Sequence, residues 1–188
     1  VFRDGGEPDS AAKLMISILH TPLIQEAILE LLEQRDGLIL GLCNGFQALI
    51  KLGLVPFGEI RDMDSTCPTL TFNKIGRHMS SIVNTRICSK LSPWLGEVSV
   101  GDIHAVAISH GEGRFVASDK MIKTLIENGQ VATQYVDLGG NATMDMPYNP
   151  NGSFYAIEGI TSPDGRVFGK MAHSERIGKN VYKNIPGD

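Results

Sequence analysis

The chain has 188 residues, 42% of them hydrophobic, which is enough for one domain with its own core. Its net charge of −4 argues against a general nucleic-acid-binding protein, and no apolar run approaches the ~20 residues that cross a membrane. Three cysteines cannot all pair with one another, and the N-terminus has no signal-peptide pattern. We therefore expect a cytoplasmic protein without nucleic-acid or membrane partners.

The first part of the chain predicts two helices and then a strand that leads into a third helix. Residues 11–34 have helical character, and Thr21 followed by Pro22 divides them, because proline favours the first turn of a helix. The apolar run 38–42 predicts a buried strand, and apolar residues then recur at helical spacing to about Leu52.

The rest of the chain predicts short strands, one helix and two strong turns. The turns are marked by Asn149-Pro-Asn-Gly and Pro163-Asp-Gly. We expect a helix at 121–127 and strands at 69–72, 82–87, 98–100, 105–108, 131–136, 154–160 and 167–171. Strands beside helices that cover a sheet predict an α/β fold.

The most specific pattern is a cysteine between the buried strand and the third helix. Such a turn exposes a nucleophile and aims the next backbone N–H, here that of Asn44, at an oxyanion. Gly41 and Gly45 flank Cys43, where we expect a side chain to crowd the turn. A position at a helix N-terminus predicts a lowered pKa for the thiol. The alternative is a buried structural cysteine.

A base for this thiol is expected near the other end of the chain. His173 and Glu175 follow the last predicted strand, and residues two apart in extended chain project to one side. The carboxylate then binds one ring nitrogen while the other faces Cys43. We favour His173 over His110 as the base because it has an adjacent carboxylate. The other histidines lack metal-ligand spacing with the cysteines, so we assign no metal.

These residues together resemble the class I glutamine amidotransferases, which hydrolyse glutamine through a Cys-His-Glu triad and deliver ammonia to a synthase. The pattern Gly41-x-Cys-x-Gly-x-Gln47 with His173-x-Glu175 carries the resemblance. Within that class, the chain is similar from about Gly5 onward to the glutaminase domains of phosphoribosylformylglycinamidine synthases of the large, single-chain type. Four segments in order carry this narrower similarity: 41–53, 108–115 (Ile-Ser-His-Gly-Glu-Gly-Arg-Phe), 148–153 (Tyr-Asn-Pro-Asn-Gly-Ser) and 159–166.

The resemblance implies a fold, a set of site residues and partners. The fold is an open mixed, mainly parallel sheet with helices on both faces, of the flavodoxin-like kind. The partners are L-glutamine and a synthase domain of the same or a partner chain. No cofactor is expected in this domain, while ATP and Mg act in the synthase region. The catalytic residues are Cys43, His173 and Glu175, and the substrate-binding residues are Asn44, Gln47, Ser109, His110 and Gly111.

One departure from the family concerns the N-terminus. In the family, a Gly-Gly loop after an early strand supplies the second oxyanion donor. Here Val1–Asp4 runs directly into Gly5–Asp9, which resembles the segment just beyond that loop. Our hypothesis is that residues are missing before Val1 and between Asp4 and Gly5. Residues 1–188 are then one glutaminase domain, the C-terminal part of a larger synthase that lacks some N-terminal residues.

Three alternatives remain open. The first is the glutaminase of another biosynthetic enzyme, although segments 109–113 and 149–153 argue against this. The second is a catalytically silent module with the same fold, which the intact Cys43, His173 and Glu175 set disfavours. The third is a thiol peptidase or esterase on a similar turn, whereas the Ser-His-Gly segment favours a free amino acid as substrate.

Overall fold

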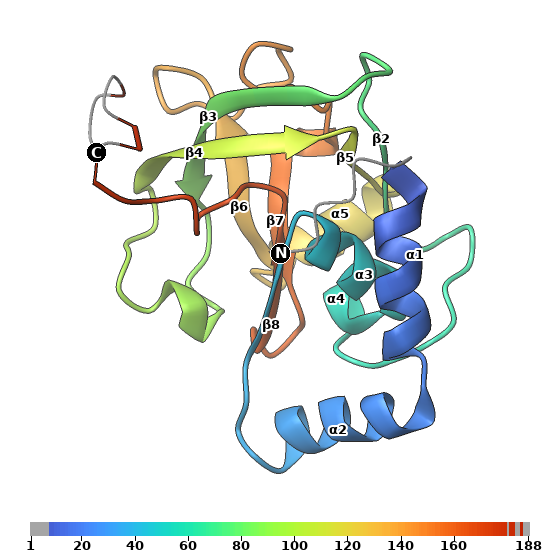
Figure 1. The fold of residues 1–188 in the computed structure, drawn as a ribbon. Helices are drawn as coiled ribbons and strands as arrows, with labels where there is room; N and C mark the ends of the chain where they lie inside the picture. The colour runs from blue at the N-terminus through green and yellow to red at the C-terminus, as the bar shows by residue number, and fades with distance from the viewer. Residues whose placement is uncertain (1–7, 180, 183–184, 186–188) are drawn as a thin grey trace.

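The computed structural model describes residues 8–179, 181–182 and 185 (Figure 1). The hypothesis on Val1–Asp4 and its junction with Gly5 therefore lies outside the described residues. No helix in the described ranges is long and apolar enough to cross a membrane. The elements are α1 (Pro8–Leu19), α2 (Pro22–Glu33), β1 (Ile39–Leu42), α3 (Asn44–Leu52), α4 (Leu54–Phe57), β2 (Thr69–Phe72), β3 (Met79–Ile87), η1 (Pro93–Leu95), β4 (Ile103–His110), β5 (Glu112–Val116), α5 (Asp119–Glu127), β6 (Val131–Val136), η2 (Phe154–Ala156), β7 (Ile157–Thr161) and β8 (Val167–Lys170).

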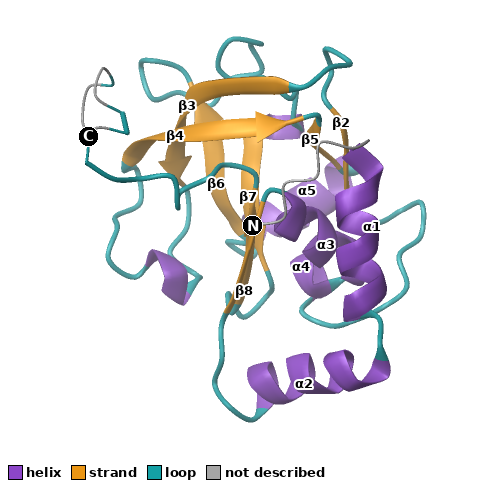
Figure 2. Cartoon of the chain, in the orientation of Figure 1, coloured by secondary structure: helices purple, strands orange, loops and turns teal. Residues whose placement is uncertain are grey.

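The described strands form a mixed sheet in the order β1-β8-β7-β6-β3-β4 and a separate β2-β5 pair. The α/β class with a mixed sheet is confirmed, consistent with the flavodoxin-like amidotransferase fold (Figure 2). Among the described ladders, only β1–β8 is parallel, so the sheet is less parallel than expected. The turn at Pro163-Asp-Gly explains part of this, because a short turn joins antiparallel strands, whereas parallel strands need a long crossover.

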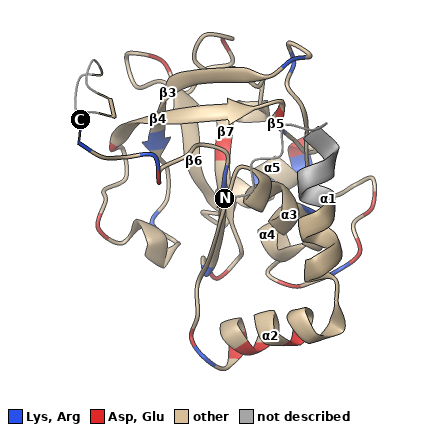
Figure 3. Ribbon diagram, viewed as in Figure 1, with Lys and Arg blue, Asp and Glu red and all other residues tan. Residues whose placement is uncertain are grey.

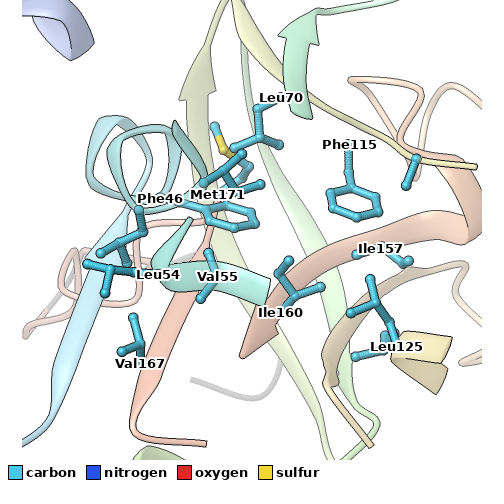
Figure 4. Packing of buried hydrophobic residues seen from close by; sticks show 14 of the residues in the cluster. Phe46, Leu54, Val55, Leu70, Phe115, Leu125, Ile157, Ile160, Val167 and Met171 are labelled. Atoms are coloured by element: carbon cyan, nitrogen blue, oxygen red, sulfur yellow. The ribbon is translucent and has the colours of Figure 1, made fainter. Parts of the chain in front are cut away.

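The main core lies between the sheet and the helices (Figure 4). Phe46 of α3, Val55 of α4 and Leu125 of α5 are buried there together with Val167 of β8. Phe168 is the next residue along β8, and it belongs to a different cluster with Leu95 of η1. This second cluster also contains Ile87 of β3 and Ala132 of β6, so side chains are buried on both faces of the sheet.

Two glycines let α3 lie directly against the strands that carry the site. A Cβ added at Gly169 of β8 would come within 2.1 Å of the Phe46 ring, and one at Gly41 of β1 within 2.4 Å of Leu49. The idea that Gly45 prevents crowding is wrong, because the described residues, apart from its chain neighbours and its own helix backbone, place no heavy atom within 4 Å of a Cβ there. Close packing at Gly41 and Gly169 thus fixes where α3 begins.

Most predicted elements are present, with some differences, among them the short helix α4, which was not predicted. The region 11–34 forms α1 and α2, and Pro22 begins α2 as predicted. The strand expected at 98–100 is wrong: a turn lies there, and Asp102 accepts a hydrogen bond from the Ser99 N–H at 2.7 Å. The strand expected at 154–160 begins only at Ile157, after η2. Strand β5 was not predicted.

Candidate active site

Cys43 sits in a strained backbone conformation at the junction of β1 and α3. Its φ of 51° and ψ of −107° lie in a region that residues other than glycine rarely adopt. The Cys43 N–H donates to the Lys170 carbonyl at 2.9 Å, and its carbonyl accepts the Gln47 N–H at 3.1 Å. Strain of this kind persists where the surroundings enforce it, and it gathers at functional sites. The predicted strand-to-helix turn is therefore present around Cys43.

The Cys43 thiol is buried, with 8% of the residue exposed. Its sulfur lies 3.9 Å from the Ser109 carbonyl oxygen. Burial raises the pKa of the thiol above 9.0, although the Asn44 backbone N–H and the charge of Arg176 act to lower it. The predicted lowering of the pKa is thus wrong, because desolvation of the thiolate outweighs the helix start. The thiol is protonated at neutral pH and needs a base to react.

His173 and Glu175 form the hydrogen bond that their spacing predicts. His173 Nδ1 lies 2.6 Å from Glu175 Oε1. Burial alone would raise the pKa of Glu175, but the hydrogen bond from His173 and the nearby positive charges lower it on balance. A carboxylate only accepts, so Nδ1 carries a proton, and in the neutral imidazole the lone pair is then on Nε2. Nε2 is buried and has no partner among the described residues, which leaves it available as a base.

The sheet brings the two ends of the chain together. In the parallel β1–β8 pair, Leu42 lies opposite Lys170, so Cys43 and His173 both follow strands that end side by side. The His173 N–H donates to the Ala107 carbonyl of β4 at 2.8 Å. Ser109, which contacts the Cys43 sulfur, lies two residues further along β4. Cys43 and His173, which follow β1 and β8, therefore both contact β4 next to residues 109–113, which we name the clamp segment.

Asn73 forms two hydrogen bonds with the backbone of the clamp segment 109–113. The Asn73 side chain donates to the His110 carbonyl at 2.8 Å, and its backbone N–H donates to the Gly111 carbonyl at 2.9 Å. Burial first, and then the charges of neighbouring histidines, lower the pKa of His110 to about 4. His110 is thus neutral near pH 7, with Nδ1 against Asn73 Oδ1 at 3.2 Å and Nε2 without a partner in the described residues.

Gln47 connects α3 to the clamp segment. Its Nε2 donates to the Glu112 carbonyl at 2.7 Å, while its buried Oε1 has no partner in the described residues. The residue is 6% exposed. Gln47 therefore fixes the distance between the start of α3 and the loop that ends β4. In the described ranges, no group of three or more His, Cys, Asp or Glu side chains is arranged to hold a metal ion.

A family model described as the CobB/CobQ-like glutamine amidotransferase domain matches residues 1–188. The chain belongs to this family. The candidate site thus lies in a glutamine amidotransferase domain. The roles of the individual residues in this amidotransferase site remain predictions.

Relatives of this amidotransferase domain include subunits of a synthase. The chain is 33% identical over 168 residues to the "Phosphoribosylformylglycinamidine synthase subunit PurQ" of Aquifex aeolicus, covering 89% of this chain and 67% of the relative. It is 36% identical over 149 residues to the Synechocystis protein of the same name, covering 79% and 61%. The chain thus spans about three fifths to two thirds of these relatives.

A solved structure also matches the amidotransferase chain. "Structure of PurLQS from Thermotoga maritima" superimposes with a TM-score of 0.66 at 26% identity, covering 94% of this chain and 69% of that one. The relatives are separate subunits by name, so the expected large single-chain type is not confirmed.

Sequence reasoning missed which residues support the clamp segment. Asn151 donates through Nδ2 to the Gly113 carbonyl at 2.8 Å and to the Tyr135 hydroxyl at 2.9 Å. Ser153 also donates to the Gly113 carbonyl, at 3.3 Å. The Asn-Pro-Asn-Gly-Ser segment was interpreted only as a turn and a family mark. Its buried amides and hydroxyl hold the segment that ends at Gly113, and polar residues in a predicted turn are the signal that could have indicated this.

Proposed function

We propose that this chain is a glutaminase that hydrolyses L-glutamine to glutamate and ammonia through Cys43, His173 and Glu175. The observation that carries the proposal is the strained, buried Cys43 after β1 and, after the neighbouring strand β8, a histidine whose Nδ1 is bound to a carboxylate and whose Nε2 has no partner among the described residues. Family membership supports it. A structural cysteine would need neither the strain nor the neighbouring base.

In the proposed reaction, His173 Nε2 takes the thiol proton as the sulfur attacks the carboxamide carbon of glutamine. The Asn44 backbone N–H donates a hydrogen bond to the carbonyl oxygen as negative charge develops there, and such a donor contributes ~3 kcal/mol in comparable sites. His173 then gives its proton to the leaving ammonia, which leaves a γ-glutamyl thioester on Cys43. Water hydrolyses the thioester with His173 again as the base, which regenerates the thiol.

Substrate contacts are proposed for the clamp and for α3. Ser109 and His110 end β4 and Gly111 follows it, and the Ser109 carbonyl oxygen lies 3.9 Å from the Cys43 sulfur. Gln47 offers a buried amide oxygen that can accept a hydrogen bond from an amide or ammonium group. These donors and acceptors favour a small polar substrate over a peptide or ester.

The proposed setting is purine biosynthesis. Ammonia from this domain would serve a synthase that uses ATP and Mg to convert formylglycinamide ribonucleotide to its amidine, in the cytoplasm. We propose that residues 1–188 belong to the glutaminase domain of such an enzyme, in the single-chain form or as a subunit. The names of the PurQ relatives and of the PurLQS structure support this setting.

The test is glutamate release from glutamine by the full chain beside its Cys43→Ala variant. We expect release from the first and background from the second. Equal rates in both would contradict the mechanism and favour the catalytically silent module. Because a synthase often activates such a domain, the assay is repeated with added synthase component before a null result is accepted.

A further inference from the structure

A buried pair of opposite charges lies beneath the turn that carries His173. Glu158 of β7 is 0% exposed and Lys170, the last residue of β8, is 7% exposed. Lys170 Nζ lies 3.9 Å from Glu158 Oε2. β7 is an interior strand of the sheet, and Figure 3 shows an acidic segment on it in red. Charges at such depth are costly, and apolar residues of similar size often serve stability equally well. The pair therefore calls for a role other than stability.

Glu158 binds the backbone directly before His173. Its Oε1 accepts the Ala172 N–H at 2.7 Å, and its own carbonyl accepts the Met171 N–H at 3.2 Å. The Thr133 hydroxyl donates to Oε2 at 2.5 Å and fixes the carboxylate from the other side. Two successive N–H groups of the turn are thus bound by one residue.

Lys170 binds both halves of the proposed catalytic centre. Its carbonyl accepts the Cys43 N–H at 2.9 Å. Its Nζ donates to the Ser174 hydroxyl at 2.9 Å, and Ser174 lies between His173 and Glu175. The turn is therefore held on one side of His173 through Ala172 and on the other side through Ser174.

We propose that Glu158 and Lys170 are positioning residues that fix the His173 imidazole relative to the Cys43 sulfur. This inference rests on the proposed function. His173 itself is also bound through its N–H to the Ala107 carbonyl, through its carbonyl to the Arg176 N–H and through Nδ1 to Glu175. Without the Glu158 carboxylate, the Ala172 N–H is left buried without an acceptor and the turn relaxes. Misplacing a reacting group by ~1 Å costs about 100-fold in rate.

A positioning role and a merely structural role predict different kinetics. Asn73 and Asn151 bind the clamp segment, and Gln47 binds the Glu112 carbonyl. None of these groups forms a hydrogen bond with Glu158 among the contacts given above. Disturbing Glu158 should therefore slow the chemical step and leave binding unchanged. A general loosening of the fold would weaken both.

The experiment follows labelling of Cys43 by a glutamine-shaped γ-electrophile, using intact mass on the full chain to obtain kinact and KI. The matched variants are Glu158→Leu/Lys170→Met and Glu158→Gln/Lys170→Met. Neither leaves an unpaired buried charge, and they differ in whether an amide remains beside the Ala172 N–H and the Thr133 hydroxyl, which both donate to Glu158. We expect the leucine variant to lose at least ~10-fold in kinact with KI within twofold. The glutamine variant should recover to within about threefold.

A second variant covers the case in which the leucine variant does not fold. Ser174 is exposed, so Ser174→Ala leaves the core intact while removing the hydroxyl that Lys170 binds. We expect about a threefold loss in kinact with KI unchanged. Either of two results would overturn this inference alone. One is a wild-type kinact in every folded variant. The other is a parallel change in kinact and KI in Glu158→Leu/Lys170→Met that is not restored in Glu158→Gln/Lys170→Met. A wild-type chain that is not labelled at Cys43 would overturn the proposed function as well.

Discussion

Replacing Glu175 by glutamine removes the negative charge beside His173 and keeps the shape of the side chain. The amide oxygen can still accept the Nδ1 proton, so the change isolates the charge that stabilises the imidazolium. Two unit charges 4 Å apart attract by about 1 kcal/mol in water and about 4 kcal/mol at an effective dielectric of 20. Because Glu175 has 39% of its side chain exposed, solvent screens part of this attraction.

We therefore expect Glu175→Gln to lose about 1 to 3 kcal/mol of transition-state stabilisation, which is about 5- to 150-fold in rate. The assay is kinact for Cys43 labelling by the γ-electrophile, together with glutamate release. The control is Glu127→Gln on α5, whose side chain is 62% exposed and far along the chain from the site. A Glu175→Gln rate within twofold of wild type, in a folded protein, would refute the role of the carboxylate.

Three further predictions concern the thiol, the packing of α3 and the clamp. Because burial raises the pKa of Cys43, its iodoacetamide alkylation should be slower at pH 7 than that of a free cysteine and should still rise through pH 9; a plateau below pH 8 would contradict this. Gly169→Ala places a Cβ within 2.1 Å of the Phe46 ring, so urea denaturation should show a loss of about 1–3 kcal/mol, whereas Gly45→Ala should change stability by less than about 0.5 kcal/mol. Gln47→Glu sets an oxygen against the Glu112 carbonyl in place of a donor, so KI for the γ-electrophile should rise about tenfold; an unchanged KI would refute the tether.

The junction around Cys43 was predictable because its signals are local. An apolar run ending at Gly41 and a helical pattern after it are enough to predict β1, α3 and the turn between them. The spacing of His173 and Glu175 likewise predicts their hydrogen bond. These interactions join residues close in sequence or follow from strands ending at one edge.

The errors come from terms that only the packed structure supplies. The pKa of Cys43 depends on how far the thiol is desolvated, and that burial comes from segments more than 60 residues away, such as Ser109. For α2, the secondary structure is predicted but its burial is not. Its predicted helix is present, but none of its residues is fully buried, and Figure 3 shows acidic positions along it.

Glu158 and Lys170 carried a signal that was not used. Each interrupts an apolar strand segment, and a charge there is unusual unless it is paired. What the sequence does not reveal is the partner, because the bond from Ala172 to the Glu158 carboxylate depends on the register of β7 against β8. A charged residue within a predicted buried strand is therefore a reason to search for a site nearby.

The most direct test of the central claim is intact mass after incubation with a glutamine-shaped γ-electrophile, followed by mapping of the adduct. The account predicts one adduct, located on Cys43, whose formation is blocked by glutamine. Cys67 and Cys88 are both partly exposed and serve as internal controls for nonspecific alkylation. No adduct on Cys43, while iodoacetamide still reaches it, would contradict a formed glutamine site with an activated thiol.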